Sequence, residues 1–329
     1  MNLFTSVEIG SLSDRLSYSD KLLLIGSCFA SEVGARLKGV KFTCQVNPFG
    51  VLYNPLSIAT SLRFLLENKF PMGEDFIFHE GLWHSLSFHS DFSAVSQEAL
   101  QENIHRSLDT CRDVMKQVSC LFLTFGTAYV YTWKETGQVV ANCHKLPEQL
   151  FRRRKLSVPE IVETYCDLLK EIWQVNPTIR VLFSVSPIRH VRDGLHENQL
   201  SKATLLLAID ELQRLYPEKL IYFPAYELLM DELRDYRFYA DDMVHPSQVA
   251  VDYIWQKFTE TFFDKDTLTM MKSVNEIKKM LNHRPLHPES AGYAKFLHQI
   301  VLKIETLSEK YPYFEFEKEK ELCLTRLNR

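Results

Sequence analysis

The sequence has 329 residues, of which 46% are hydrophobic and 24% are charged, and its formal net charge is −4. These values are typical of a globular protein large enough to fold without disulfides or a structural metal. The slight negative charge argues against nucleic acid as a partner, and we interpret the densest basic run, 152–155, as a solvated face.

The amino-terminal residues lack the basic start and apolar stretch of a signal peptide, and no apolar run reaches the roughly 18 residues of a membrane span. The seven cysteines form an odd count without CxxC spacing, which indicates neither a disulfide framework nor a zinc site. We therefore expect a cytoplasmic protein with no metal, no cofactor and no membrane partner.

Five short apolar runs, rich in β-branched and aromatic residues, are predicted to be buried strands. Their hydrophobicity is continuous rather than alternating, as in strands that are covered on both faces. These runs are residues 21–25, 42–46, 120–125, 180–185 and 220–223.

Amphipathic helical patterns separate the predicted strands, and the one that follows Ser157 opens with a capping box. Strand–helix alternation of this kind predicts a parallel sheet with helices on both faces. Active groups in such sheets gather at the carboxyl ends of the strands. The predicted helices are residues 55–67, 94–118, 158–174, 198–215 and 246–262.

Two insertions and a helical extension complete the predicted organisation. Residues 70–92 form an irregular or hairpin insertion, and 129–150 a second insertion that begins with a β-hairpin over 129–140. We divide the chain into an α/β domain, 1–265, and a helical extension packed on it, 266–329. Its predicted helices are 267–281 and 289–311, and we interpret 304–320 as a solvated helix and tail.

Ser27 lies where the first predicted strand ends at Gly26 and a helix begins. A serine at such a turn stands on the rim of the sheet, where a helix N-terminus favours negative charge on an oxyanion. The alternative is that Ser27 only caps the helix. Cys28 is a competing nucleophile, although Phe29 suggests that this side of the turn faces the core.

Asp242 and His245 form an Asp-x-x-His pair shortly before a predicted helix. Within one tight turn, the carboxylate can fix the tautomer of the imidazole and stabilise the imidazolium as it forms. Asp241 could replace Asp242, and a metal site or a simple capping Asp beside a surface His are further alternatives. In a doubly wound sheet this pair would meet Ser27 at the same rim.

The segment Gly26-Ser27-Cys28-Phe29-Ala30 spells the signature of the GSCFA family, a branch of the SGNH/GDSL hydrolases, which the sequence resembles over about residues 20–265. The resemblance implies a flavodoxin-like three-layer α/β/α fold with a five-stranded, mainly parallel sheet. Further matching blocks follow in order at residues 47–50, 53–55, 125–128, 141–145 and 184–190.

The resemblance also implies roles for individual residues. In the wider SGNH group a serine attacks, an Asp-x-x-His pair activates it, and a Gly and an Asn help to bind the oxyanion. Carried over to this sequence, Ser27 is the nucleophile, His245 takes its proton and Asp242 orients His245. Gly50 matches the glycine block, and its N–H would join that of Ser27 at the oxyanion.

The asparagine block is where the sequence departs from the group, because Gly126-Thr127-Ala128 stands where Gly-x-Asn is usual. An alanine side chain cannot donate a hydrogen bond, and losing one oxyanion donor costs about 10²–10³-fold in turnover. Asn142, Thr127 and His144 are candidate replacements, although Asn142 could equally be a turn residue.

Other polar residues at the predicted rim are candidates for substrate binding. Arg189 could hold a carboxylate or phosphate, or simply form a surface salt bridge. His190, His144 and His84 are further candidates, although single histidines are more often structural. Several aromatic residues would suit stacking on a sugar or acyl chain, or core packing: Trp83, Phe88, Tyr129, Tyr131 and Trp133.

The sequence thus predicts a serine hydrolase that cleaves an ester or acyl group, such as an O-acetyl group on a carbohydrate, through an acyl-enzyme on Ser27. An acyltransferase with the same triad and a non-catalytic binding module that keeps the fold remain open alternatives. The expected partner is a small-molecule or glycan ester, and the oligomeric state is left open.

Overall fold

The computed structural model describes residues 5–10 and 15–327. Its central sheet has five strands, each pair of neighbours parallel, in the order β10-β9-β5-β1-β2. All five predicted strands are confirmed. They are β1 (Leu22–Gly26), β2 (Cys44–Val46), β5 (Cys120–Phe125), β9 (Arg180–Val185) and β10 (Leu220–Phe223).

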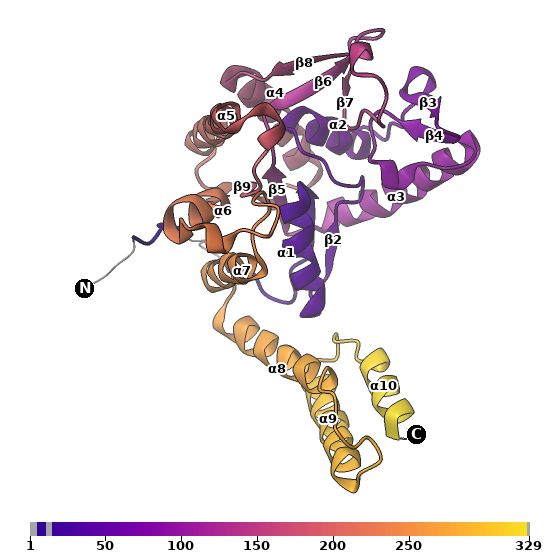
Figure 1. Ribbon diagram of the computed structural model, residues 1–329, viewed down its shortest axis with the longest axis vertical. Coiled ribbons are helices and arrows are strands. Elements are labelled where there is room, and N and C mark those ends of the chain that lie inside the picture. Colours follow the sequence, from indigo (N-terminus) through magenta and orange to yellow (C-terminus); the bar gives the residue numbers. More distant parts are fainter. Residues whose placement is uncertain (1–4, 11–14, 328–329) are drawn as a thin grey trace.

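Helices cover both faces of this sheet, which confirms the three-layer α/β/α prediction (Figure 1). One face carries α2 (Pro55–Leu66), α3 (Gln97–Gln117), α4 (Val158–Val175) and α5 (Leu195–Leu215). The other face carries α1 (Cys28–Gly39), α6 (Ala225–Glu227), a π-helix over Leu228–Leu233 and α7 (Gln248–Phe262).

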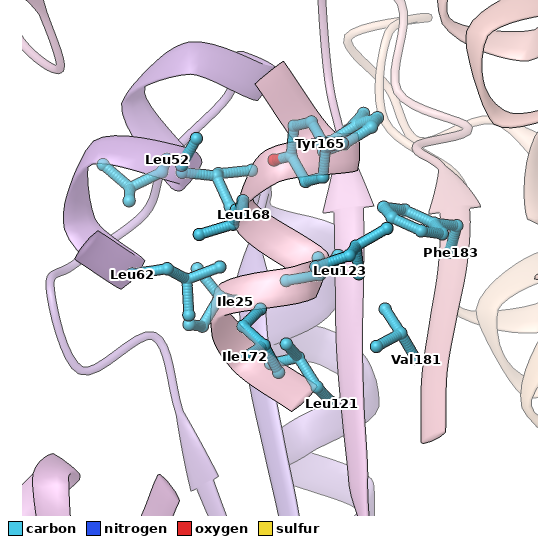
Figure 2. Packing of buried hydrophobic residues seen from close by; sticks show 14 of the residues in the cluster. Ile25, Leu52, Leu62, Leu121, Leu123, Tyr165, Leu168, Ile172, Val181 and Phe183 are labelled. Carbon is cyan, nitrogen blue, oxygen red and sulfur yellow. The ribbon is translucent and has the colours of Figure 1, made fainter. Parts of the chain in front are cut away.

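Alternation along the buried strands divides the core between the two faces. Leu121 and Leu123 of β5 pack beneath α4, where Figure 2 shows them beside Leu168 and Ile172. Phe122, between them in the sequence, belongs to the cluster on the opposite face. Successive side chains of a strand point to opposite faces, so a continuous apolar run supplies both cores at once.

The caps explain where the helices begin. Ser157 accepts a hydrogen bond from the Glu160 N–H at 3.4 Å, as the predicted capping box requires. The helix predicted from residue 246 begins two residues later, at Gln248, because Ser247 is its N-cap. Pro246 instead pairs with Tyr239 in an isolated β-bridge.

Both insertions lie at the carboxyl end of the sheet and contain antiparallel strands. The first holds a hairpin of β3 (Phe76–His79) and β4 (Leu82–Ser85). The second supplies β6 (Tyr129–Trp133) and β7 (Val139–Val140), which form a three-stranded sheet with the adjoining β8 (Phe151–Lys155) in the order β7-β6-β8.

The basic run 152–155 lies in this small sheet, and its three arginines are exposed, in agreement with the prediction of a solvated face. The run forms most of β8, where side chains alternate between the two sides of the strand. The side chain of Arg153 therefore points to the opposite side of β8 from those of Arg152 and Arg154. Its guanidinium stacks on the ring of Tyr129 at 3.8 Å and pairs with Asp193 at 2.5 Å.

The carboxyl-terminal helices are α8 (Lys265–Leu281), α9 (Ala291–Lys310) and α10 (Glu317–Leu327), and they extend away from the insertions (Figure 1). They dock at the amino end of the sheet, where Tyr18 meets Phe314 edge to face at 4.7 Å. The tail prediction for 304–320 is wrong at Phe314 and Phe316, which are buried. No helix in the described ranges is long and apolar enough to cross a membrane.

Candidate active site

Ser27 occupies the turn between β1 and α1, and its neighbour explains the shape of this turn. Gly26 has φ +148°, and a Cβ there would lie 2.2 Å from the carbonyl oxygen of Thr124. Only glycine allows β1 to come this close to β5 at its end. The chain then turns sharply, and Ser27 is left at the rim of the sheet as the N-cap of α1.

Asn47 connects this turn to the turn that follows β2. Its side-chain oxygen accepts the Gly26 N–H at 2.8 Å, and its amide donates to Ser31 Oγ at 2.8 Å. The residue itself has φ +43°, a conformation that asparagine tolerates better than most residues. Asn47 therefore fixes the position of Ser27 from both sides, a role that sequence analysis did not assign.

Asp242 and His245 form a closed hydrogen-bonded turn before α7. One carboxylate oxygen of Asp242 accepts the N–H groups of Val244 and His245, both at 2.9 Å. The other oxygen lies 2.6 Å from Nδ1 of His245. These backbone hydrogen bonds, together with the imidazole, lower the pKa of Asp242 to about 2. The carboxylate is consequently ionised near neutral pH.

Ser27 and His245 line the same cavity, although 218 positions separate them in the sequence. The cavity has a volume of about 740 Å³, within the range of small-molecule sites. In the described part of the chain Nε2 of His245 has no hydrogen-bond partner, so no hydrogen bond joins it to Ser27. Catalytic hydrogen bonds often form only in the substrate complex, so this gap alone does not rule out the pair.

The environment of Ser27 is compatible with both roles considered from the sequence. Its Oγ accepts the N–H of Phe29 at 3.3 Å, so the serine does cap α1. The hydroxyl hydrogen is not consumed by this contact and is free to be donated. Ser27 is only 1% exposed, so its hydroxyl is reached only through the cavity.

Cys28 also lines the cavity, which corrects the expectation that this side of the turn faces the core. Successive helical residues point about 100° apart, so the burial of Phe29 does not determine the direction of its neighbour. The thiol of Cys28 lies 3.7 Å from the Tyr53 hydroxyl.

The two backbone N–H groups predicted for the oxyanion are already engaged. Ser27 N–H donates to the carbonyl of Thr124 at 3.2 Å, and Gly50 N–H donates to the carbonyl of Asn47 at 2.8 Å. Gly50 lies against His89 and is not among the described residues that line the cavity. The Gly50 N–H is therefore not free to bind an oxyanion in this structure.

One backbone donor at this turn has no partner. The N–H of Cys28, at the first position of α1, makes no hydrogen bond within residues 5–10 and 15–327. The first N–H groups of a helix lack intrahelical acceptors and carry the positive end of the helix dipole. Its helix position alone is the signal that could have identified this donor from the sequence.

The structure places the remaining predicted residues in two groups. Thr127, Asn142, Arg189 and His190 line the cavity. Thr127 Oγ1 is engaged on both sides, because it accepts the Tyr129 N–H at 3.1 Å and shares a 3.1 Å hydrogen bond with Ser201 Oγ. Asn142 likewise accepts the His144 N–H at 2.8 Å and donates to Ser90 at 3.2 Å.

His84 and His144 form the second group, which lies behind the cavity wall. Their rings are 4.6 Å apart, and Nε2 of His144 contacts the carbonyl of Ser85 at 2.7 Å. Nδ1 of His84 contacts Ser93 Oγ at 2.6 Å. Burial lowers the pKa of His144 to about 4. Neither histidine is among the described lining residues, so their predicted contact with substrate is not supported.

Charged groups at the cavity are mostly paired. Arg153 pairs with Asp193, and Arg192 pairs with Glu148. The Arg189 guanidinium stacks on the ring of Tyr239 at 4.0 Å. No His, Cys, Asp or Glu cluster that could hold a metal ion occurs in the described part of the chain.

Comparisons with known proteins bear on this site. A model of the GSCFA family matches residues 21–258, and a model of the C-terminal domain of GSCFA domain proteins matches residues 274–329. A search of curated proteins found no match. The first of these models spans the chain from β1 through most of α7 and includes Ser27, Asp242 and His245.

Three solved structures show distant similarity, each at 10% sequence identity. A Clostridium thermocellum family 3 carbohydrate esterase has a TM-score of 0.34 and covers 78% of this chain and 98% of its own. A carbohydrate esterase family 3 from Talaromyces cellulolyticus has a TM-score of 0.33, with 77% and 98% covered. An acetyl xylan esterase from the rumen bacterium Butyrivibrio proteoclasticus has a TM-score of 0.37, with 78% and 67% covered.

Proposed function

The chain belongs to the GSCFA family, and on that premise we propose that it is a serine esterase in which Ser27 attacks, His245 accepts the proton and Asp242 orients His245. The observation that carries the proposal is that Ser27 and His245 line one cavity while Asp242 holds the imidazole by a 2.6 Å hydrogen bond.

Asp242 prepares His245 for the role of base in two ways. Its hydrogen bond to Nδ1 places the proton on that nitrogen and leaves Nε2 as the acceptor that faces away from the turn. Its negative charge then stabilises the imidazolium that forms when Nε2 takes the Ser27 proton. Both side chains are 49% exposed, so His245 has room to rotate towards Ser27 when substrate binds.

The reaction proceeds through an acyl-enzyme. Ser27 Oγ bonds to the ester carbonyl carbon, and His245 passes the abstracted proton to the departing alcohol oxygen. A water then donates its proton to His245 and attacks the acyl carbon, which releases the acid and restores Ser27. The unpaired N–H of Cys28 is the backbone donor that we assign to the oxyanion in both steps.

The cavity lining combines apolar and aromatic side chains with a few hydrogen-bonding groups. Tyr129 and Tyr131 lie on its wall beside Arg153, and the lining also includes Asn142 and Lys145. Aromatic faces with interspersed hydrogen-bonding groups suit a sugar ring or a similar polar alcohol. We therefore propose a small acyl group, such as acetyl, on a carbohydrate or comparable alcohol as the substrate.

A fluorophosphonate probe tests the nucleophile, with mass spectrometry to locate the modified peptide. We expect labelling of the wild-type protein at Ser27 and none in Ser27→Ala. Cys28→Ala is the matched control, because it removes the neighbouring nucleophile in the same cavity and should leave labelling intact. Labelling that follows Cys28 instead of Ser27 would contradict the proposal.

A non-catalytic binding module is the second candidate function. The occupied N–H groups of Ser27 and Gly50, and the absence of a Ser27–His245 hydrogen bond among the described contacts, favour it. A folded wild-type protein that neither reacts with the probe nor hydrolyses 4-nitrophenyl acetate would support this alternative. Product analysis with an added alcohol distinguishes an esterase from an acyltransferase with the same triad.

A further inference from the structure

His190 follows β9 and lies in a tightly defined position on the cavity wall. Its backbone N–H donates to the side chain of Asn198 at 2.9 Å, and its ring meets that of Tyr53 edge to face at 6.1 Å. A Cβ on Gly126 would lie 3.3 Å from Nε2 of His190 and 3.1 Å from the Tyr53 carbonyl. The missing side chain at Gly126 thus makes room for this imidazole at the end of β5.

The imidazole of His190 has no partner of its own. Neither ring nitrogen forms a hydrogen bond with any residue in the described ranges. His190 is partly exposed at the cavity, so its ring nitrogens can be reached by water or by a ligand atom that enters there. The ring nitrogens of His190 are therefore available to a group bound in the cavity that holds Ser27 and His245.

Lys202 lies behind His190 and ties together the strand ends on either side of it. This lysine, on α5, is 1% exposed, and its ammonium group donates to the carbonyls of Gly126 and Ser186, both at 2.7 Å. No carboxylate in the described part of the chain forms an ion pair with it. Burying such a group is costly, and burial lowers the pKa of Lys202 to about 7.

The surroundings of His190 keep its ring neutral. Burial, together with the nearby positive charge of Lys202, lowers the pKa of His190 to about 4. Arg153 and His245 act in the same direction, and only Asp193 opposes them. A neutral imidazole offers one N–H donor without adding a positive charge that would repel the imidazolium formed at His245.

The donors around Ser27 leave one position at the oxyanion to be filled. Two of the predicted N–H groups are occupied by backbone carbonyls, Ala128 has no side-chain donor, and the Thr127 hydroxyl is engaged with Ser201 and the Tyr129 N–H. Cys28 N–H supplies a single hydrogen bond, whereas serine hydrolases surround the oxyanion with at least two. His190 lines the same cavity and has an unused donor.

We propose that His190 is a catalytic residue that donates a neutral N–H hydrogen bond to the oxyanion, and that Lys202 is the positioning residue that holds it. The inference rests on the proposed esterase function. The proton of His190 stays on its nitrogen throughout, so the proton balance of the reaction is still carried by Ser27, His245 and the leaving alcohol.

Paired substitutions at His190 test the donor directly, with 4-nitrophenyl acetate as the probe substrate. His190→Leu removes the donor, and we expect kcat to fall about 10²–10³-fold with little change in KM. His190→Gln restores an N–H at the position of Nε2 and should recover at least about tenfold of that loss. His196→Leu, an identical change at an exposed histidine of α5, should have wild-type kcat.

The outcomes separate this inference from the proposed function. Wild-type kcat in His190→Leu, with Ser27 still labelled by the fluorophosphonate, overturns the role of His190 and leaves the esterase proposal intact. Equal losses in His190→Leu and His190→Gln also overturn it, because a donor would then make no difference. A wild-type protein without labelling or turnover overturns both.

Lys202→Met tests the positioning role with a readout that packing alone would not change. NMR titration of the His190 ring protons should give a midpoint near pH 4 in the wild type and a higher midpoint in Lys202→Met, because the opposing charge is gone. An unshifted midpoint in a folded Lys202→Met protein overturns the role of Lys202. A wild-type midpoint at the ordinary histidine value overturns the neutral-donor proposal itself.

Discussion

The two ends of the central sheet differ in what they bury. At the carboxyl end the chain buries polar groups, among them Ser27, Ser186 and Lys202, around a cavity of about 740 Å³. At the amino end it buries aromatic rings instead. Tyr18 and Phe42 stack there at 4.2 Å, and Phe314, from the segment between α9 and α10, packs against Tyr18.

This difference indicates that the carboxyl end of the sheet serves activity and the amino end serves stability. An unpaired lysine and unsatisfied donors destabilise the folded state, since each loses hydration without full compensation. Packed aromatic rings do the opposite, through burial of apolar surface and edge-to-face contacts. The helical extension adds apolar burial at the amino end. This stabilisation offsets the free-energy cost of burying polar groups at the carboxyl end. Substitutions at the two ends should separate activity from stability.

The largest expected effect is at the carboxyl end, where Ser27→Ala should lower kcat/KM for an ester by about 10⁴–10⁶-fold. The same change removes an N-cap and should cost only about 1 kcal/mol of stability. Steady-state kinetics and denaturant unfolding measure the two quantities.

Ser96→Ala is the matched control for Ser27→Ala, since Ser96 caps α3 by a 3.1 Å hydrogen bond and lies outside the cavity. It should lose a similar amount of stability and keep full activity. If Ser27→Ala retained more than about a tenth of the wild-type rate, Ser27 would be only a helix cap. Its role as the nucleophile at the carboxyl end would then be contradicted.

The next largest expected effect is a loss of stability at the amino end of the sheet. Phe316, 1% exposed, packs against Phe314 at 5.9 Å and lies beneath the ammonium group of Lys41. Phe316→Ala should lower the free energy of unfolding by about 3–5 kcal/mol. The kcat measured below the unfolding transition should stay at the wild-type value, because the site is at the other end of the sheet.

The exposed Tyr313, at 57%, supplies the control for Phe316. Tyr313→Ala should change stability by less than about 1 kcal/mol. A large loss of kcat in folded Phe316→Ala would show that the extension couples to the cavity, which the division between the two ends excludes.

A smaller loss is expected for Asp242→Asn, about 10²-fold in kcat, because solvent at this half-exposed pair partly replaces the carboxylate. The pKa of Asp242 is about 2, so the wild-type carboxylate is ionised throughout the pH range 5–9. The ratio of wild-type to variant kcat should then show no step from protonation of this carboxylate across that range.

Asp241→Asn distinguishes the two neighbouring carboxylates in the same assay. Asp241 contributes none of the hydrogen bonds that close the turn around His245, so this variant should retain wild-type kcat. A greater loss in Asp241→Asn than in Asp242→Asn would reassign the orienting residue.

The smallest expected effect is a change in the pH dependence of stability when the buried His144 is replaced. The pKa of His144 is about 4 in the folded protein and close to 6.5 when unfolded, so the unfolded chain binds more protons between these values. Stability that is fully present above pH 6.5 is thus lost as the pH falls towards 4. His144→Gln should reduce this loss by about 1–3 kcal/mol.

Urea unfolding at pH 7, 5.5 and 4.5 measures the effect of His144→Gln. The exposed His287 provides the control, and His287→Gln should follow the wild-type pH dependence. An unchanged slope in His144→Gln would mean that this ring is not held neutral by burial.

Much of the architecture could be predicted from the sequence, because strands and helices follow from local hydrophobic periodicity. The runs at 120–125, 180–185 and 220–223 match β5, β9 and β10 residue for residue. The turn at Gly26 and the spacing of Asp242 and His245 are likewise local features. Each was recognisable from a few neighbouring residues.

Other features depended on which distant segments meet. Whether the Ser27 N–H is free is decided by the carbonyl opposite it, so no local pattern could reveal that the Thr124 carbonyl accepts this N–H. Likewise, no local pattern revealed that the exposed Arg153 stacks on Tyr129, because the two residues meet only when β8 pairs with β6.

Lys202 lies in an ordinary amphipathic helix, and only the packing of α5 against the ends of β5 and β9 buries its charge. The sequence by itself determined the elements and the residues available for chemistry. The tertiary structure decided which of their hydrogen-bonding groups remain unsatisfied, because burial and pairing are properties of long-range contacts and not of the chain order.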